Sequence, residues 1–206
     1  MPKYRKLVLA LAALLGTAVA LPGPALAQFS DGWKFLEAVR KGNDKDLQEL
    51  FEKGGPNIIN TRDQTSLDTP LHIAARKKNL RYINFLIAAG ANVNMRNADG
   101  ETALVIASNL GFLEAVPPLI AAGAKVDESN STGETPLITA VHNRNIVLMR
   151  VLLQAGADPD RTDNSGRSAR DYAKLDPKSE SLLAEIKASA RAKSKATNGK
   201  QVFGPK

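Results

Sequence analysis

Apolar residues recur along this chain in two alternating groups, each with the three- and four-residue spacing of one helix face. The first group holds a leucine followed three residues later by an alanine, and the second group begins about ten residues further on. The columns of the first group return every 33 residues, at Leu71, Leu104 and Leu137 and at Ala74, Ala107 and Ala140. A strict period of this size predicts a stacked array of two-helix units that bury their apolar faces against their neighbours.

Polar residues between the apolar groups indicate where the helices start and stop. Threonine opens the first helix of three successive units, at Thr69, Thr102 and Thr135. Its hydroxyl can accept a hydrogen bond from a free amide of the first turn, and each such cap stabilises the helix by about 1 kcal/mol. Proline follows the threonine at two of these starts, at Pro70 and Pro136. The first helical position suits proline because its N–H would have no partner within the helix. Glycine closes the second helix, where the chain must turn left-handed, at Gly90, Gly123 and Gly156.

TPLHIAA at 69–75 and INFLIAAGANVN at 83–94 resemble the ankyrin repeat, a 33-residue unit with a T-P-L-H-x-A signature. The resemblance implies an all-α ankyrin-repeat solenoid of helix–turn–helix units with projecting hairpin-like loops. Within a repeat domain spanning 28–192, five units are expected at about 31–60, 61–94, 95–127, 128–160 and 161–192. His72 completes the signature in the second unit alone and is expected to bond locally around Thr69.

The third unit departs from the pattern in its second helix, LEAVPPLIAAG. Pro117 and Pro118 stand at positions that are interior to the helix in the unit before, where a proline costs about 3 kcal/mol. Either this helix starts late, with Pro117 in its first turn, or it is kinked. The prolines are then a tolerated irregularity or a functional hinge.

The N-terminus has the layout of a secretory signal peptide over residues 1–27. Three basic residues precede the apolar run 7–21, and Ala25-Leu26-Ala27 predicts cleavage before Gln28. The chain has no cysteine, which excludes disulfides and thiolate chemistry. A short leader without disulfides favours a bacterial periplasm, with secretion as the alternative.

The formal charge of +7 is unevenly placed. Residues 28–173 hold 17 basic and 18 acidic residues, whereas 174–206 hold 8 basic and 3 acidic ones. The basic excess therefore lies in the leader and the tail, and no nucleic-acid partner is expected. Residues 193–206 are predicted to be a basic disordered tail, either a solubilising end or a weak contact to membrane or cell wall.

Residue patterns for catalysis are absent from the sequence, which has no G-x-S-x-G, no P-loop and no clear serine–histidine–acid set. The two histidines, His72 and His142, stand 70 residues apart, so no metal site is expected. We expect no enzyme activity, no catalytic residue and no cofactor.

The ankyrin resemblance implies a protein-binding module acting as a monomer, whose partner meets the loop tips and the last turns of the first helices. The helix positions are Arg40, Lys41, Arg76, Lys77, Asn109, Leu110, His142 and Asn143. The loop-tip positions are Ser66, Asp68, Asp99, Glu101, Thr132, Glu134, Ser165 and Arg167. Because the first two units are basic at these positions, we expect a partner with an acidic surface. For any individual residue, a simply solvated charge is an equal alternative.

Overall fold

The computed structural model describes residues 30–198, with side chains described to residue 189, and every element in that range is helical. The predicted leader and the chain beyond 198 lie outside it. The helices are α2 (Asp31–Lys41), α3 (Asp44–Gly54), α4 (Pro70–Arg76), α5 (Leu80–Ala88), α6 (Ala103–Asn109), α7 (Val116–Ala121), α8 (Pro136–His142), α9 (Ile146–Gln154), α10 (Ala169–Leu175) and α11 (Glu180–Asn198), with 3-10 turns η1 (Gly55–Ile58) and η2 (Leu113–Ala115). The expected all-α array is confirmed.

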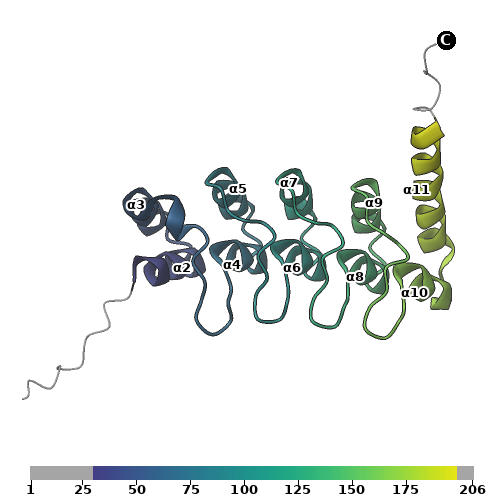
Figure 1. Cartoon of the computed structure of the whole chain (residues 1–206), viewed down its shortest axis with the longest axis horizontal. Helices are drawn as coiled ribbons and strands as arrows, with labels where there is room; N and C mark the ends of the chain where they lie inside the picture. The colour runs from purple at the N-terminus through teal and green to yellow at the C-terminus, as the bar shows by residue number, and fades with distance from the viewer. Residues whose placement is uncertain (1–29, 199–206) are drawn as a thin grey trace, which may run out of the picture. The chain divides into compact units, whose positions relative to one another are not determined.

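Within 31–198 the helices form two rows, as Figure 1 shows. The first helix of each unit (α2, α4, α6, α8, α10) packs on its counterparts in the neighbouring units, and the second helix packs on the first. Leu71, Leu104 and Leu137 are almost fully buried between these rows. Each buried leucine contributes about 1.5–3 kcal/mol, so the stack depends on contacts between units.

The helix starts have the expected caps. The Thr69 hydroxyl accepts from the His72 amide at 3.4 Å, and Thr102 and Thr135 make the equivalent bond. Pro70 and Pro136 occupy the first helical position. The closing glycines have φ of 87°, 89° and 103°, at Gly90, Gly123 and Gly156.

The loops between units are hairpin-like, although the described residues contain no strand beyond an isolated bridge from Thr162 to Ser168. Each loop closes on itself through a backbone bond, such as Asn97 N–H to Glu101 O at 3.0 Å. Adjacent loops are also joined by backbone bonds of 2.9–3.1 Å, from Ala98 to Ser66, from Ser131 to Asp99 and from Asn164 to Thr132. The loop tips therefore form a connected row.

The second helix of the third unit starts late. Residues 113–115 form η2, and α7 begins at Val116 with Pro117 and Pro118 in its first turn. Because the first-turn amides have no partner within a helix, the prolines cost few hydrogen bonds there. Leu119 remains fully buried, so the shortened helix keeps its place in the stack.

The last helix corrects the expected tail boundary. A disordered tail was expected from residue 193, but α11 continues to Asn198. Its sequence is rich in alanine, lysine, leucine and glutamate, which are strong helix formers and can extend a helix beyond the packed core. Leu182 and Ile186 bury its start in the stack.

Candidate binding face and its polar ladder

The structure brings most of the predicted binding residues into direct contact with one another. In three successive units a loop-tip carboxylate bonds to the side chain eight residues later, at the end of the first helix. The pairs are Asp68–Arg76 at 3.1 Å, Glu101–Asn109 at 3.1 Å and Glu134–His142 at 2.9 Å. Each loop is thereby held against the first helix of its own unit.

Further contacts join these pairs from unit to unit. Asn97 Nδ2 donates to Asp68 Oδ1 at 3.0 Å and to Glu101 Oε2 at 3.4 Å. The hydroxyl of Thr139 bonds to Asn109 Oδ1 at 3.0 Å. In the last junction the ring of His142 lies edge-on to Tyr172, with centroids 4.3 Å apart.

We call this chain of contacts the polar ladder. It runs from the second unit to the fifth and comprises Asp68, Arg76, Asn97, Glu101, Asn109, Glu134, Thr139, His142 and Tyr172. Its members bond to one another, so they fix the relative positions of loops and first helices.

The arginines of the basic half are compensated by carboxylates, which corrects the expectation of a plainly basic face. Arg40 bonds to Glu37 at 2.8 Å and to Asp63 at 2.5 Å. The Ser66 amide and the Arg40 guanidinium lower the pKa of Asp63. Arg76 is shared between Asp68 and Glu101, the latter at 3.8 Å. The correction arises because the loop carboxylates Asp63, Asp68 and Glu101 fold back onto the helices and add to Glu37 on α2.

The lysines of this half have fewer carboxylates beside them. Lys41 is highly exposed, with Glu37 at 3.7 Å. Lys77 is exposed and lines a hollow of about 470 Å³ beside Ile73 and Arg76. This hollow lies between the first and second units, at the predicted binding positions.

The remaining predicted residues are outside the ladder. Asp99, Thr132, Leu110 and Asn143 are exposed, and Ser66 is half-buried with its hydroxyl accepting from the Asp68 amide at 3.3 Å. In the last loop, Ser165 bonds to Asp163, and the Arg167 guanidinium lies 6.0 Å from the centre of the Tyr172 ring. These side chains project between the fixed members of the ladder.

A column of loop residues that the sequence analysis missed organises each loop. The side-chain oxygen of Asn97 accepts from the amides of Asp99 and Glu101 at 3.0 and 2.9 Å. Asn130 and Asp163 do the same in the next two loops. The signal was available as an Asn or Asp recurring every 33 residues.

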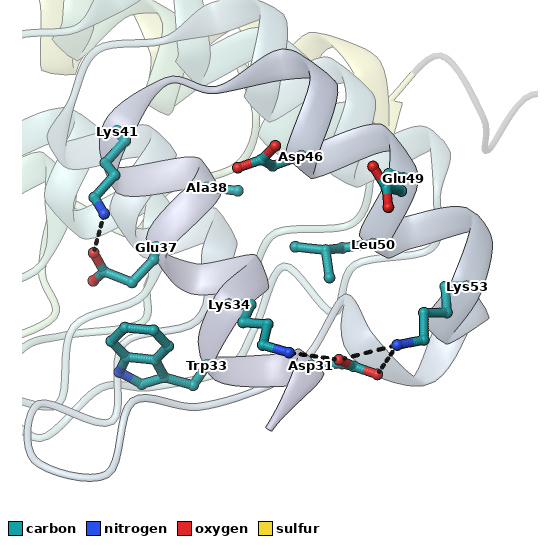
Figure 2. Close-up of a pocket in the computed structure, with 10 residues that line it drawn as sticks. All are labelled: Asp31, Trp33, Lys34, Glu37, Ala38, Lys41, Asp46, Glu49, Leu50 and Lys53. Carbon is teal, nitrogen blue, oxygen red and sulfur yellow. Dashed lines mark hydrogen bonds and ion pairs between the residues drawn. The ribbon is translucent and has the colours of Figure 1, made fainter. Parts of the chain in front are cut away.

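A second hollow, of about 360 Å³, lies at the N-terminal end of the stack between α2 and α3 (Figure 2). Asp31 pairs with Lys34 and Lys53, and Lys41 reaches Glu37. Asp46 and Glu49 lie on α3, at the positions that are equivalent to Tyr82 and Phe85 on α5 of the next unit. These substitutions adapt the end unit to water, as a terminal repeat requires.

The described part of the chain has neither a cluster of metal ligands nor a membrane-spanning helix. Among residues 30–189, no group of three or more His, Asp or Glu side chains converges as a metal site would require. None of the helices within 30–198 is long and apolar enough to cross a membrane.

Curated relatives are similar in sequence to parts of this chain. A probable E3 ubiquitin-protein ligase of Oryza sativa is 34% identical over 92 residues, 45% of this chain and 18% of that protein. Ankyrin repeat and SOCS box protein 11 of Mus musculus is 54% identical over 41 residues, 20% of this chain and 13% of that protein. A Notch-regulated ankyrin repeat-containing protein of Xenopus tropicalis is 37% identical over 79 residues, 36% of this chain and 66% of that protein. The chain thus spans less than two thirds of each of these relatives.

Family models describe the repeats directly. A model of ankyrin repeats in three copies matches residues 35–130, and a model of ankyrin repeats in many copies matches 119–173. Together these matches cover residues 35–173, from the first unit into the first helix of the fifth. The chain belongs to the ankyrin repeat proteins, whose repeats are modules for binding other proteins.

Proposed function

We propose that this chain is a non-catalytic scaffold that binds one partner protein through its first-helix row and loop tips. The observation that carries the proposal is the polar ladder, because it holds loops and helices as one preorganised surface. Preorganisation lowers the ordering cost of binding. Asp99, Thr132 and Lys77 project from that surface and are free to meet a partner.

The proposed absence of catalysis is supported by the contacts of His142, the exposed one of the two histidines. Nδ1 of His142 is engaged by Glu134 at 2.9 Å, and its ring lies against Tyr172. Two of the relatives carry names of a ubiquitin ligase and a SOCS box protein. We infer that the region shared with them corresponds to the part that holds a protein rather than to a catalytic domain.

The partner surface is proposed to be acidic opposite Lys41 and Lys77. Arg40 and Arg76 are unsuitable for the test, because reversing them would place a carboxylate beside Asp63 or Asp68. The test is an in-cell crosslink and pull-down of the tagged chain, comparing the unmodified protein with a Lys41→Ser, Lys77→Ser variant. Lys45→Ser, exposed on α3, is the control.

One dominant protein, recovered with the control and reduced with the double variant, supports this face. Equal recovery with all three chains places the partner elsewhere. We further propose that the chain acts as a monomer, which light scattering at increasing concentration tests.

Export is proposed from the leader alone, with the periplasm as the compartment and secretion as the alternative. The support is the basic start, the apolar run 7–21 and the Ala-Leu-Ala end of residues 1–27. Cell fractionation followed by N-terminal sequencing tests it. A mature chain beginning at Gln28 in the periplasmic fraction supports export, and an intact Met1 in the cytosol contradicts it.

The alternative function is attachment to the cell envelope through the C-terminal segment. From Ile186 to Lys206 the chain has six basic residues and no acidic one, and each charge near an anionic surface can contribute about 1 kcal/mol. Truncation after residue 192 distinguishes the two proposals. Loss of envelope association favours the alternative, and unchanged localisation favours the repeat face.

A further inference from the structure

The turns that join the first and second helices adopt one geometry in four units. The residue after the first helix's last turn has positive φ, 70° at Gly42, 53° at Lys78, 62° at Gly111 and 50° at Arg144. In each unit its amide bonds back three residues, at 2.9–3.3 Å. These four positions are therefore structurally equivalent and lie along one edge of the array, which we call the turn edge.

Lys78 and Arg144 stand where two of the units have glycine. A left-handed conformation strains a non-glycine residue, so these side chains need a compensating role. Arg144 has one, because its guanidinium donates to both carboxylate oxygens of Asp176 at 2.6 and 2.8 Å. Lys78 makes no side-chain bond or ion pair with any residue in the described part of the chain.

The lysines of the second unit leave a local positive charge on this edge. Lys77 and Lys78 are both exposed and have no carboxylate partner among residues 30–189. Asp44, the first residue of α3, pairs with Arg81 and accepts a hydrogen bond from the hydroxyl of Tyr82. A carboxylate from outside the chain would complement these two ammonium groups.

Further along, the turn edge exposes apolar side chains among polar ones. Two hollows, of about 630 and 430 Å³, lie side by side because Asn143 and Arg144 line both of them. The first is bordered by Leu110 and Val147 and the second by Leu175, which are 38%, 54% and 65% exposed. Exposed apolar side chains grouped in this way are typical of an interaction surface.

We propose that the turn edge is the docking site for an acidic–apolar segment of a partner protein. The segment places carboxylates at Lys77 and Lys78 and two apolar side chains in the hollows of units three to five. Glu114 is exposed in the third unit and repels acidic residues there, so the acidic half of the segment lies at the second unit. Units packed ~8–10 Å apart place the two halves within reach of roughly nine extended residues.

This inference rests on the proposed binding function; it shares Lys77 with the first-helix row but places the contact on the turn edge instead of the loop tips. The probe is a display library of random twelve-residue peptides, selected on the purified chain. We expect enriched peptides to carry Asp or Glu in one half and Leu, Ile, Val or Phe in the other. Enrichment of basic peptides, or of peptides without this division, overturns the proposal.

The best enriched peptide is then synthesised and its Kd measured against variants. Lys78→Gly removes the charge while relieving the backbone, so the melting temperature is expected not to fall and Kd to rise about two- to fivefold. Leu110→Ser with Leu175→Ser is expected to raise Kd about tenfold or more. Lys45→Gln is the charge-matched control and leaves Kd unchanged.

The outcomes separate this inference from the function on which it rests. One outcome is a Kd that is unchanged in the Lys78→Gly and leucine variants but raised by Asp99→Lys with Thr132→Lys. That result contradicts docking at the turn edge and supports binding at the loop tips. No enrichment over an empty support, together with no captured protein in the pull-down, overturns both.

Discussion

Nε2 of His72 lies 3.0 Å from the carbonyl oxygen of Glu101, so a side chain of the second unit holds the loop of the third. The same Nε2 reaches the Met95 carbonyl at 3.0 Å, and Nδ1 accepts from the amide and hydroxyl of Thr69 at 3.0 and 2.8 Å. These partners require a neutral imidazole with its proton on Nε2. The ring therefore joins two units through bonds that only this tautomer can make.

Replacing His72 should weaken the array at this junction. His72→Ala removes the donor to the Met95 and Glu101 carbonyls and the acceptor of the Thr69 amide, and is expected to lower the free energy of unfolding by about 2–3 kcal/mol. Urea unfolding monitored by circular dichroism measures it. His142→Ala is the comparison, since His142 is exposed and should cost less than about 1 kcal/mol. Equal costs for the two variants would contradict the junction role.

The junction also predicts a pH dependence. Burial lowers the pKa of His72 below its ordinary 6.5, although nearby Asp68 acts in the opposite direction. Below about pH 6.5, His72 binds a proton in the unfolded chain but remains largely neutral in the folded chain. The stability contributed by the neutral ring is thus complete above that pH and declines as the pH falls towards the folded-state pKa.

Urea unfolding at several pH values between about 7.5 and 5 tests this, because most carboxylates titrate below that range. The unmodified chain should lose stability over the range. His72→Gln, which cannot titrate, should lose distinctly less. Parallel slopes for the two chains would exclude His72 as the cause.

Asn97 provides a matched test of the polar ladder. Asn97 and Asn130 accept the same two backbone bonds, but Asn97 also donates to Asp68 in the preceding unit. Asn97→Ala is expected to cost about 1–3 kcal/mol and Asn130→Ala less. A double-mutant cycle with Asp68→Ala should give a coupling of about 0.5–3 kcal/mol for Asn97. Additive costs would show that the bond across units contributes nothing.

Ser108 offers a prediction of the opposite sign. Its hydroxyl is fully buried on α6 and is the one side-chain polar atom so buried without a hydrogen-bond partner in the described part of the chain. Ala75 occupies the equivalent position one unit earlier. Ser108→Ala is expected to raise the free energy of unfolding by about 1 kcal/mol, measured by urea unfolding. A destabilised variant would indicate that the hydroxyl is satisfied in solution.

The sequence predicted what depends on local chemistry. Thr69 caps a helix and Gly90 ends one because these properties belong to the residue and its nearest neighbours. The late start of α7 was one of two alternatives that local rules allowed for Pro117. The extent of α11 was underestimated, because composition indicated a tail while residue propensity favours a helix.

The polar ladder was not predicted, because it depends on how neighbouring loops lie in space. Asp68 and Asn97 are 29 residues apart, and no single unit contains both. The eight-residue pairing of Asp68 with Arg76, repeated at Glu101 and Glu134, was visible in the sequence and could have indicated half of it. The basic face was overestimated for the same reason, since three of the four compensating carboxylates, Asp63, Asp68 and Glu101, come from loops.

Mapping lysine-specific cross-links between this chain and its captured partner tests most directly whether the ladder-fixed face is the binding surface. Lys41 and Lys77 lie at the predicted helix positions of that face, whereas Lys45 and Lys125 are exposed elsewhere. We expect the cross-links to concentrate at Lys41 and Lys77. Cross-links confined to Lys45 and Lys125 would contradict binding through this face.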